Sequence, residues 1–171
     1  MDRRSVLLAL AGGAVVAAQT ASAQPVQAPA AVRLSPGEFR RMALMGGEFA
    51  IQTSRLALER SRNPRIRNFA ELEIEEQIAV AASLGATPGG VPLRPDQAEM
   101  LQRLASTPPG PRFDAAYVRG QIMGHEELLQ VHSAYAQGGS DPVGRATANV
   151  AVPSIKTHLT ILSGLRRGGM A

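Results

Sequence analysis

The chain has 171 residues, a formal net charge of +4 and no cysteine. The missing cysteine excludes a disulfide framework, a lipoprotein anchor, c-type haem attachment and thiolate metal sites. The basic residues are scattered and aromatic residues make up 4% of the chain, which argues against a nucleic-acid-binding surface. The length is enough for one domain that is held together by its hydrophobic core.

The N-terminus has the composition of an export signal. A charged start, "MDRR", precedes the apolar run "VLLALAGGAVVAA", and "ASA" before Gln24 has the small-x-small pattern of a signal-peptidase site. The run is shorter than the roughly 20 apolar residues that span a bilayer, so we expect no stable membrane anchor. Residues 1–23 are therefore predicted to be a cleaved signal peptide and the periplasm the destination. The pair Arg3-Arg4 leaves both the Sec and the twin-arginine route open.

The remaining chain is predicted to be a flexible leader, residues 24–34, and one domain, residues 35–167. Helix starts are well marked in this domain. Ser35 and Pro36, with Glu38 behind them, form an N-cap, a first-turn proline and a capping-box glutamate. The cap-and-proline pattern recurs at Asn63-Pro64 and Asp141-Pro142.

These signals predict an all-α fold, a four-helix bundle. The long helices are expected near 36–61, 64–84, 112–137 and 142–166, and a proline- and glycine-rich connection between the second and third carries a short helix near 95–106. Very short turns join the first and last pairs into antiparallel hairpins. Pro153, inside the fourth helix, is expected to kink or break it.

The segment "AELEIEEQIA" divides its four glutamates between two faces of the second helix. At about 100° per residue, Glu71 and Glu75 point away from the apolar stripe and are expected to be solvated. Glu73 and Glu76 lie on the stripe. A buried carboxylate must be paired, neutralised or coordinated, and no arginine or lysine lies at mid-depth on an inward stripe.

Other inward polar residues come from the remaining helices. Glu48 lies on the edge of the first stripe, His125 on the third and His158 on the fourth. Counting about 1.5 Å per residue puts Glu48, Glu73 or Glu76, and His125 near one level. His158 lies more than a turn away, unless a kink at Pro153 shifts it.

Further expectations concern neighbouring side chains. His132 is about 10 Å along the axis from His125, too far to share an ion, and is interpreted as structural or exposed. Tyr117 and Tyr135 are expected to flank the bundle with their hydroxyls in water. The buried face of the fourth helix is predicted to consist of Val143, Val150, Ala151, Ile155, Leu162 and Leu165.

Carboxylates and imidazoles that converge inside a bundle indicate a transition-metal site for iron, manganese or zinc. The candidate ligands are Glu48, Glu73, Glu76, His125 and His158. The Glu-x-x-His spacing that marks di-iron bundles is missing. Two alternatives stay open: a hydrogen-bonded polar layer that only fixes packing, and a b-type haem on the two histidines.

The second half of the chain resembles a known family. The segments "FDAAYVRGQIMGHEELLQVH" and "GGSDPVGRATANVAVPSIKTHLTIL" are similar to the bacterial exported family called domain of unknown function 4142. The resemblance implies a ferritin-like bundle in the periplasm, of uncharacterised activity, with His125 and His158 as recurrent polar positions. It also implies an Asp-His pair where this chain has Glu76 and Gln77, so that one nitrogen ligand is lost.

Two functions of different classes follow. The first is a periplasmic bundle with a metal centre; the alternative is a non-catalytic cell-envelope protein, structural or interacting with an envelope partner, whose inward polar groups fix packing. No nucleophile–base–acid set, phosphate loop or dinucleotide fingerprint indicates an enzyme. Oxidase or peroxide chemistry would need the metal first.

Overall fold

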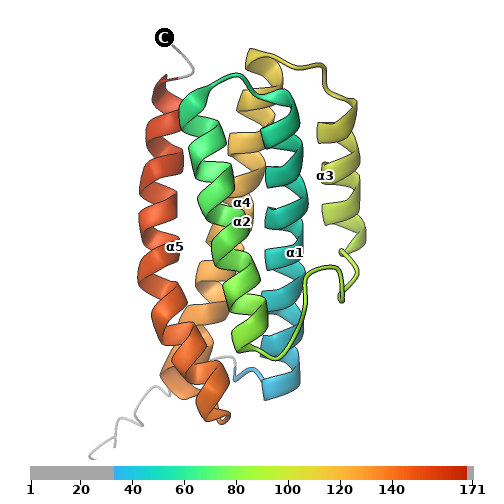
Figure 1. The fold of residues 1–171 in the computed structure, drawn as a ribbon. Helices are drawn as coiled ribbons and strands as arrows, with labels where there is room; N and C mark the ends of the chain where they lie inside the picture. The colour runs from blue at the N-terminus through green and yellow to red at the C-terminus, as the bar shows by residue number, and fades with distance from the viewer. Residues whose placement is uncertain (1–32, 169–171) are drawn as a thin grey trace, which may run out of the picture. The chain divides into compact units, whose positions relative to one another are not determined.

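A computed structural model of the protein describes residues 33–168 (Figure 1). The predicted signal peptide and all but the end of the predicted leader lie outside the described residues. The all-α prediction is confirmed, because residues 33–168 contain helices and no strand. The helices are α1 (Pro36–Arg60), α2 (Pro64–Ser83), α3 (Pro95–Ser106), α4 (Pro111–Gly138) and α5 (Pro142–Gly168).

The helices begin where their caps predict. Ser35 Oγ accepts a hydrogen bond from the Glu38 amide at 3.3 Å, and the Glu38 carboxylate accepts one from the Ser35 amide at 2.8 Å. Asn63 Oδ1 accepts from the Arg65 amide, and Asp141 Oδ2 accepts from the Gly144 amide. Each cap satisfies a first-turn N–H group that has no partner inside the helix.

The four long helices form a bundle with one long crossover. Turns of a few residues join α1 to α2 and α4 to α5 into antiparallel hairpins. Helix α4 packs against α1 and helix α5 against α2, so every neighbouring pair is antiparallel. The segment between α2 and α4 returns along the bundle, and its short helix α3 lies outside the four, against α1 and α4 (Figure 1).

The buried face of α5 differs from the predicted one. Val143 and Val150 are 58% and 74% exposed, so their predicted burial is wrong. Small residues fill the upstream part of the seam instead, and the buried positions follow a spacing of three and four: Gly144, Ala148, Ala151, Ile155, His158, Leu162 and Leu165. A helix can approach its neighbour closely along such a row, whereas hydrophobicity alone favoured the larger valines.

The expected solvent contact of the two tyrosine hydroxyls is also wrong. Tyr117 and Tyr135 are each 1% exposed. The Tyr117 hydroxyl shares a hydrogen bond of 2.9 Å with Ser54 Oγ, and the Tyr135 hydroxyl accepts one from the Asp141 amide. Each ring is buried because its polar atom finds a partner inside the protein.

Pro153 does not break α5, which continues through it. The proline lies on the exposed face, as does Asn149, whose carbonyl loses its usual helical donor. Because Asn149 is an exposed residue, water can replace the lost donor. Within residues 33–168, no helix combines the length and apolar character needed to cross a bilayer.

The buried His132 should make the protein sensitive to acid. Its side chain lies against the edge of Phe39, is 2% exposed, and its Nδ1 has no hydrogen-bond partner among the described residues. Burial lowers the pKa of His132 from 6.5 to about 4. The unfolded chain therefore takes up a proton below pH 6.5 that the folded protein refuses until about pH 4. We expect this residue to cost about 2–3 kcal/mol of unfolding free energy between pH 7 and pH 4.5.

Urea unfolding of the wild type and of His132→Leu at both pH values measures this cost. The variant should lose less stability on acidification than the wild type does, by about that amount. Equal losses in the two proteins would contradict the assignment, whatever the difference in their stability at pH 7.

Candidate metal centre

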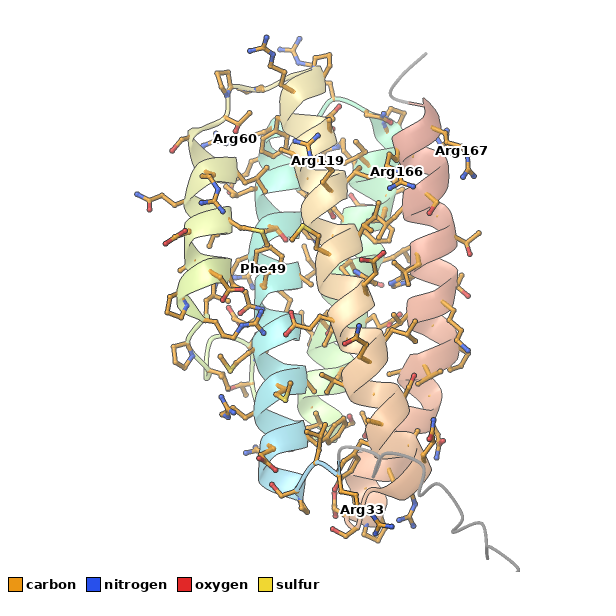
Figure 2. All side chains as sticks on the ribbon, turned by 180° about the vertical axis from the view of Figure 1, so that it is seen from behind. Arg33, Phe49, Arg60, Arg119, Arg166 and Arg167 are labelled. Carbon is orange, nitrogen blue, oxygen red and sulfur yellow. The ribbon has the colours of Figure 1, made fainter. Side chains whose placement is uncertain are left out.

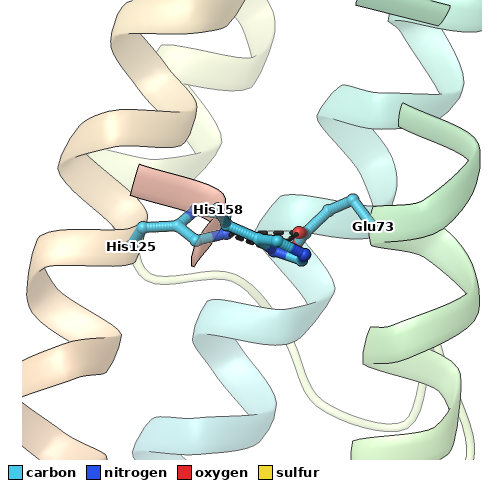
Figure 3. A group of neighbouring side chains, drawn as sticks. All are labelled: Glu73, His125 and His158. Carbon is cyan, nitrogen blue, oxygen red and sulfur yellow. Dashed lines mark hydrogen bonds and ion pairs between the residues drawn. The ribbon is translucent and has the colours of Figure 1, made fainter. Parts of the chain in front are cut away.

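Three buried side chains from three helices meet at the centre of the bundle (Figure 3). Glu73 comes from α2, His125 from α4 and His158 from α5, and they are 0%, 1% and 8% exposed. His158 Nδ1 lies 2.8 Å from Glu73 Oε2. His125 Nε2 lies 3.2 Å from that same oxygen and 3.2 Å from His158 Nδ1. One oxygen and two nitrogens thus form a nearly equilateral triangle, a group of donor atoms close enough together to hold one metal ion.

A backbone carbonyl fixes the tautomer of His125. Its Nδ1 lies 2.8 Å from the carbonyl oxygen of Gln121, one turn earlier on α4. A carbonyl can only accept, so Nδ1 must carry a proton. In the neutral imidazole Nε2 then presents a lone pair, and it faces Glu73 and His158.

The surroundings of Glu73 and His158 decide which of the two side chains holds the proton between them. Burial by itself raises the pKa of Glu73, but its contacts with His125 and His158 outweigh it and hold the pKa at about 2. Burial by itself lowers the pKa of His158, but the hydrogen bond to Glu73 and the charges of Glu73 and Glu76 outweigh it and raise that pKa. The centre is therefore a carboxylate with a proton held on the His158 side.

Further polar groups orient the triangle from outside. Gln77 Nε2 donates to the second oxygen of Glu73 at 3.0 Å. The outer nitrogen of His158, Nε2, lies 3.4 Å from Glu76 Oε2, and that oxygen also accepts from Ser154 Oγ at 2.6 Å. Both histidines thus point one nitrogen inward and hold the other against an acceptor, the arrangement that positions metal-ligating histidines.

Glu48 lies outside this group. It is 7% exposed, and its carboxylate accepts hydrogen bonds of 2.6 Å from the Gly89 amide and from Gln52. It fastens the start of the long connection to α1. The structure therefore brings together four of the five candidate residues, with Glu76 behind His158.

Depth counting placed His158 wrongly. We expected it more than a turn from the level of Glu73, whereas it makes the shortest contact in the triangle. Counting residues from the turns fixes depth only within one hairpin, because the offset between two hairpins depends on how their side chains pack.

The direct contact of the two histidines argues against the haem alternative. Two axial nitrogens on opposite sides of one iron, each about 2 Å from it, lie about 4 Å apart. The nitrogens of His125 and His158 are 3.2 Å apart, which is too close.

The chain has a recognisable sequence family and a similar solved structure. The sequence model of the family described as "Domain of unknown function (DUF4142)" matches residues 21–165. The chain belongs to this family. No curated protein matches the sequence. Among solved structures, "CopM in the Cu(II)-bound form" is similar, with a TM-score of 0.68 and 16% identity over 80% of this chain and 98% of that chain. At this identity the likeness establishes a shared helical fold.

In this DUF4142 member, Gln77 lies beside the candidate metal centre and contacts Glu73. The family resemblance implies that a nitrogen ligand is lost at this position, and in the structure the Gln77 side chain donates to Glu73. The orienting roles of the Gln121 carbonyl and of Ser154 were missed. The first could have been inferred, because the carbonyl four residues before an inward histidine lies on the same helix face. The role of Ser154 could not, because its contact with Glu76 depends on the register of α5 against α2.

A glycine on α1 makes room for Gln77. A Cβ atom at Gly47 would lie 2.7 Å from Gln77 Oε1. We expect Gly47→Ala to push the Gln77 amide away from Glu73 and to lower the unfolding free energy by about 1–3 kcal/mol, although alanine is the better helix former. Thermal and urea unfolding would measure this change.

Gly120→Ala is the matched control on α4. A Cβ there meets nothing closer than Phe49 at 3.8 Å, an ordinary contact. This change should therefore stabilise the helix by up to about 1 kcal/mol. A Gly47→Ala protein as stable as Gly120→Ala would show that the amide of Gln77 is not held in place.

Proposed function

We propose that this protein is an exported four-helix bundle that binds one divalent transition-metal ion through Glu73, His125 and His158. The observation that carries the proposal is the triangle of donor atoms, with edges of 2.8, 3.2 and 3.2 Å. Ligands about 2.1 Å from an ion and at right angles lie about 3.0 Å apart, as in a facial set of two histidines and a carboxylate. The triangle has nearly this size.

The electrostatics of the centre support a cation at this position. Glu73 Oε2 is negative and His125 Nε2 presents a lone pair, so the two repel unless positive charge lies between them. In the metal-free protein the proton on His158 Nδ1 supplies that charge, and a metal ion would take its place. Glu76 then acts behind His158, where it orients the ring.

The donor set limits the choice of ion. Two imidazoles and one carboxylate suit zinc, iron and manganese, and they also suit copper(II), the ion named for the structurally similar CopM. For a given nitrogen and oxygen site, affinity rises from manganese through iron to copper, with zinc below copper. Copper(II) and zinc are therefore expected to bind most tightly in vitro. The composition of residues 1–23 supports a periplasmic location.

Metal binding should stabilise the protein. At a free ion concentration of about 100 times Kd, the unfolding free energy rises by about 2.7 kcal/mol, or about 5–10 °C in Tm. Elemental analysis of protein purified from a bacterial periplasm should give about one ion per chain. Differential scanning fluorimetry with zinc, copper(II), iron(II) and manganese should show the shift, and a chelator should reverse it.

Glu73→Gln keeps the shape of the side chain and removes its charge, so it should abolish both the bound ion and the shift. Glu75→Gln, an exposed neighbour on α2, is the control and should behave as the wild type. A wild-type protein that is isolated without metal, and whose Tm responds to none of the four ions, would exclude the proposal. The non-catalytic envelope protein with a proton-bridged polar layer would then stand.

A further inference from the structure

A second site lies at the end of the bundle where α2 and α4 begin and α5 ends. A cavity of about 380 Å³ opens there between the three helices. Its floor is apolar and is formed by Ile66, Val118 and Leu165, all at most 6% exposed. Its walls include three charged side chains, Asp114, Arg119 and Arg166. Ile66 is two turns from Glu73, about 10 Å along α2, so this cavity is separate from the metal centre.

The two arginines of the cavity are available to a ligand. Arg119 and Arg166 are exposed, and neither makes an ion pair or a side-chain hydrogen bond within residues 33–168. Figure 2 shows both of them toward the same end of the bundle, from adjacent helices. Unpaired guanidinium groups beside an apolar cavity favour a ligand that combines an anionic group with an apolar body.

Asp114 places a second requirement on the ligand, in addition to its anionic group. It lies in the "FDAAY" segment, and its Oδ1 is shielded from solvent without a hydrogen-bond partner among the described residues. The Asp114 carboxylate lines the cavity and makes no side-chain hydrogen bond within residues 33–168, so a ligand that brings an N–H or O–H group to its accessible oxygen would satisfy it. A ligand that fits all three side chains needs an N–H or O–H group beside its anionic group.

We propose that this cavity binds a small anionic amphiphile, a medium-chain carboxylate with a hydroxyl group near its head. The acyl chain would lie on Ile66, Val118 and Leu165, the carboxylate between Arg119 and Arg166, and the hydroxyl group would donate to Asp114. This site does not depend on the metal centre, and Glu73→Gln should leave it intact.

Isothermal titration of the full chain at 150 mM salt tests the site with three probes. These are 3-hydroxydecanoate and decanoate, each below its micelle concentration, and 1-decanol below its solubility limit. We expect the hydroxy acid to bind about 10-fold more tightly than decanoate, and 1-decanol to bind more weakly still. Arg119→Gln combined with Arg166→Gln should weaken both acids at least about 10-fold. Asp114→Ala should remove the preference for the hydroxy acid.

The matched control is Arg62→Gln combined with Arg112→Gln. These two exposed arginines lie at the same end of the bundle, but they do not line the cavity. Their removal should change the affinity less than about 2-fold at this ionic strength. Equal weakening by the two double variants, equal binding of 1-decanol, or no binding of either acid would each overturn the proposal.

Discussion

Glu73→Ala is expected to lower the unfolding free energy of the metal-free protein by about 3–5 kcal/mol. The carboxylate is fully buried and receives the contacts of His125, His158 and Gln77. Its removal leaves a buried imidazolium without its counter-charge and an amide donor without its acceptor, and it opens a cavity. Each of these changes destabilises the folded state, and none of them stabilises the unfolded one.

Urea unfolding with a chelator present measures this loss, and the same helix provides the control. Glu71→Ala and Glu75→Ala remove exposed carboxylates from the same acidic segment, and they should change the stability by no more than about 0.5 kcal/mol. If Glu73→Ala cost as little as these two, the carboxylate would not be the counter-charge of the histidines.

The triple variant Glu73→Met, His125→Leu and His158→Leu should recover most of the stability that Glu73→Ala loses. Replacement of an entire buried ionic cluster by apolar side chains of similar volume is often neutral, or stabilising by about 1–4 kcal/mol, because no charge remains to be desolvated. The surroundings suit this exchange, since Phe69 already lies against both histidine rings. We expect the metal-free triple variant to unfold within about 2 kcal/mol of the wild type.

The triple variant also separates stability from metal binding. It should be folded and yet show no rise in Tm with any of the four ions, whereas the wild type responds to at least one. A triple variant as unstable as Glu73→Ala would contradict this expectation and would indicate that the polar layer specifies the packing of the bundle. A triple variant that still gained stability from added metal would place the ion elsewhere.

The helices were predictable because their signals are local. Ser35, Asn63 and Asp141 each cap a helix within a few residues in sequence, and a proline at the first position sets the backbone angle there. The division of the glutamates in the acidic segment between a buried and an exposed helix face was predictable for the same reason. The period of 3.6 residues puts Glu73 on the buried face and leaves Glu71 and Glu75 on the exposed one.

Contacts between helices were predicted less well. Glu48 was expected near the metal centre but contacts the Gly89 amide, since the long connection folds back over α1 in a way that no local signal encodes. On α5, the valines lie outside the seam because close approach favours Gly144 and Ala148, and helix packing decides which of two adjacent stripes is buried.

The sequence alone determined five helices and their ends, and it limited the candidate ligands to a few inward carboxylates and imidazoles. The tertiary structure decided which of them meet. The depth of His158 relative to Glu73 depends on how one hairpin slides against the other, and that offset is set by side-chain packing over the whole interface. The assembly of "AELEIEEQIA" with two distant histidines into one donor triangle therefore appears only in the folded bundle.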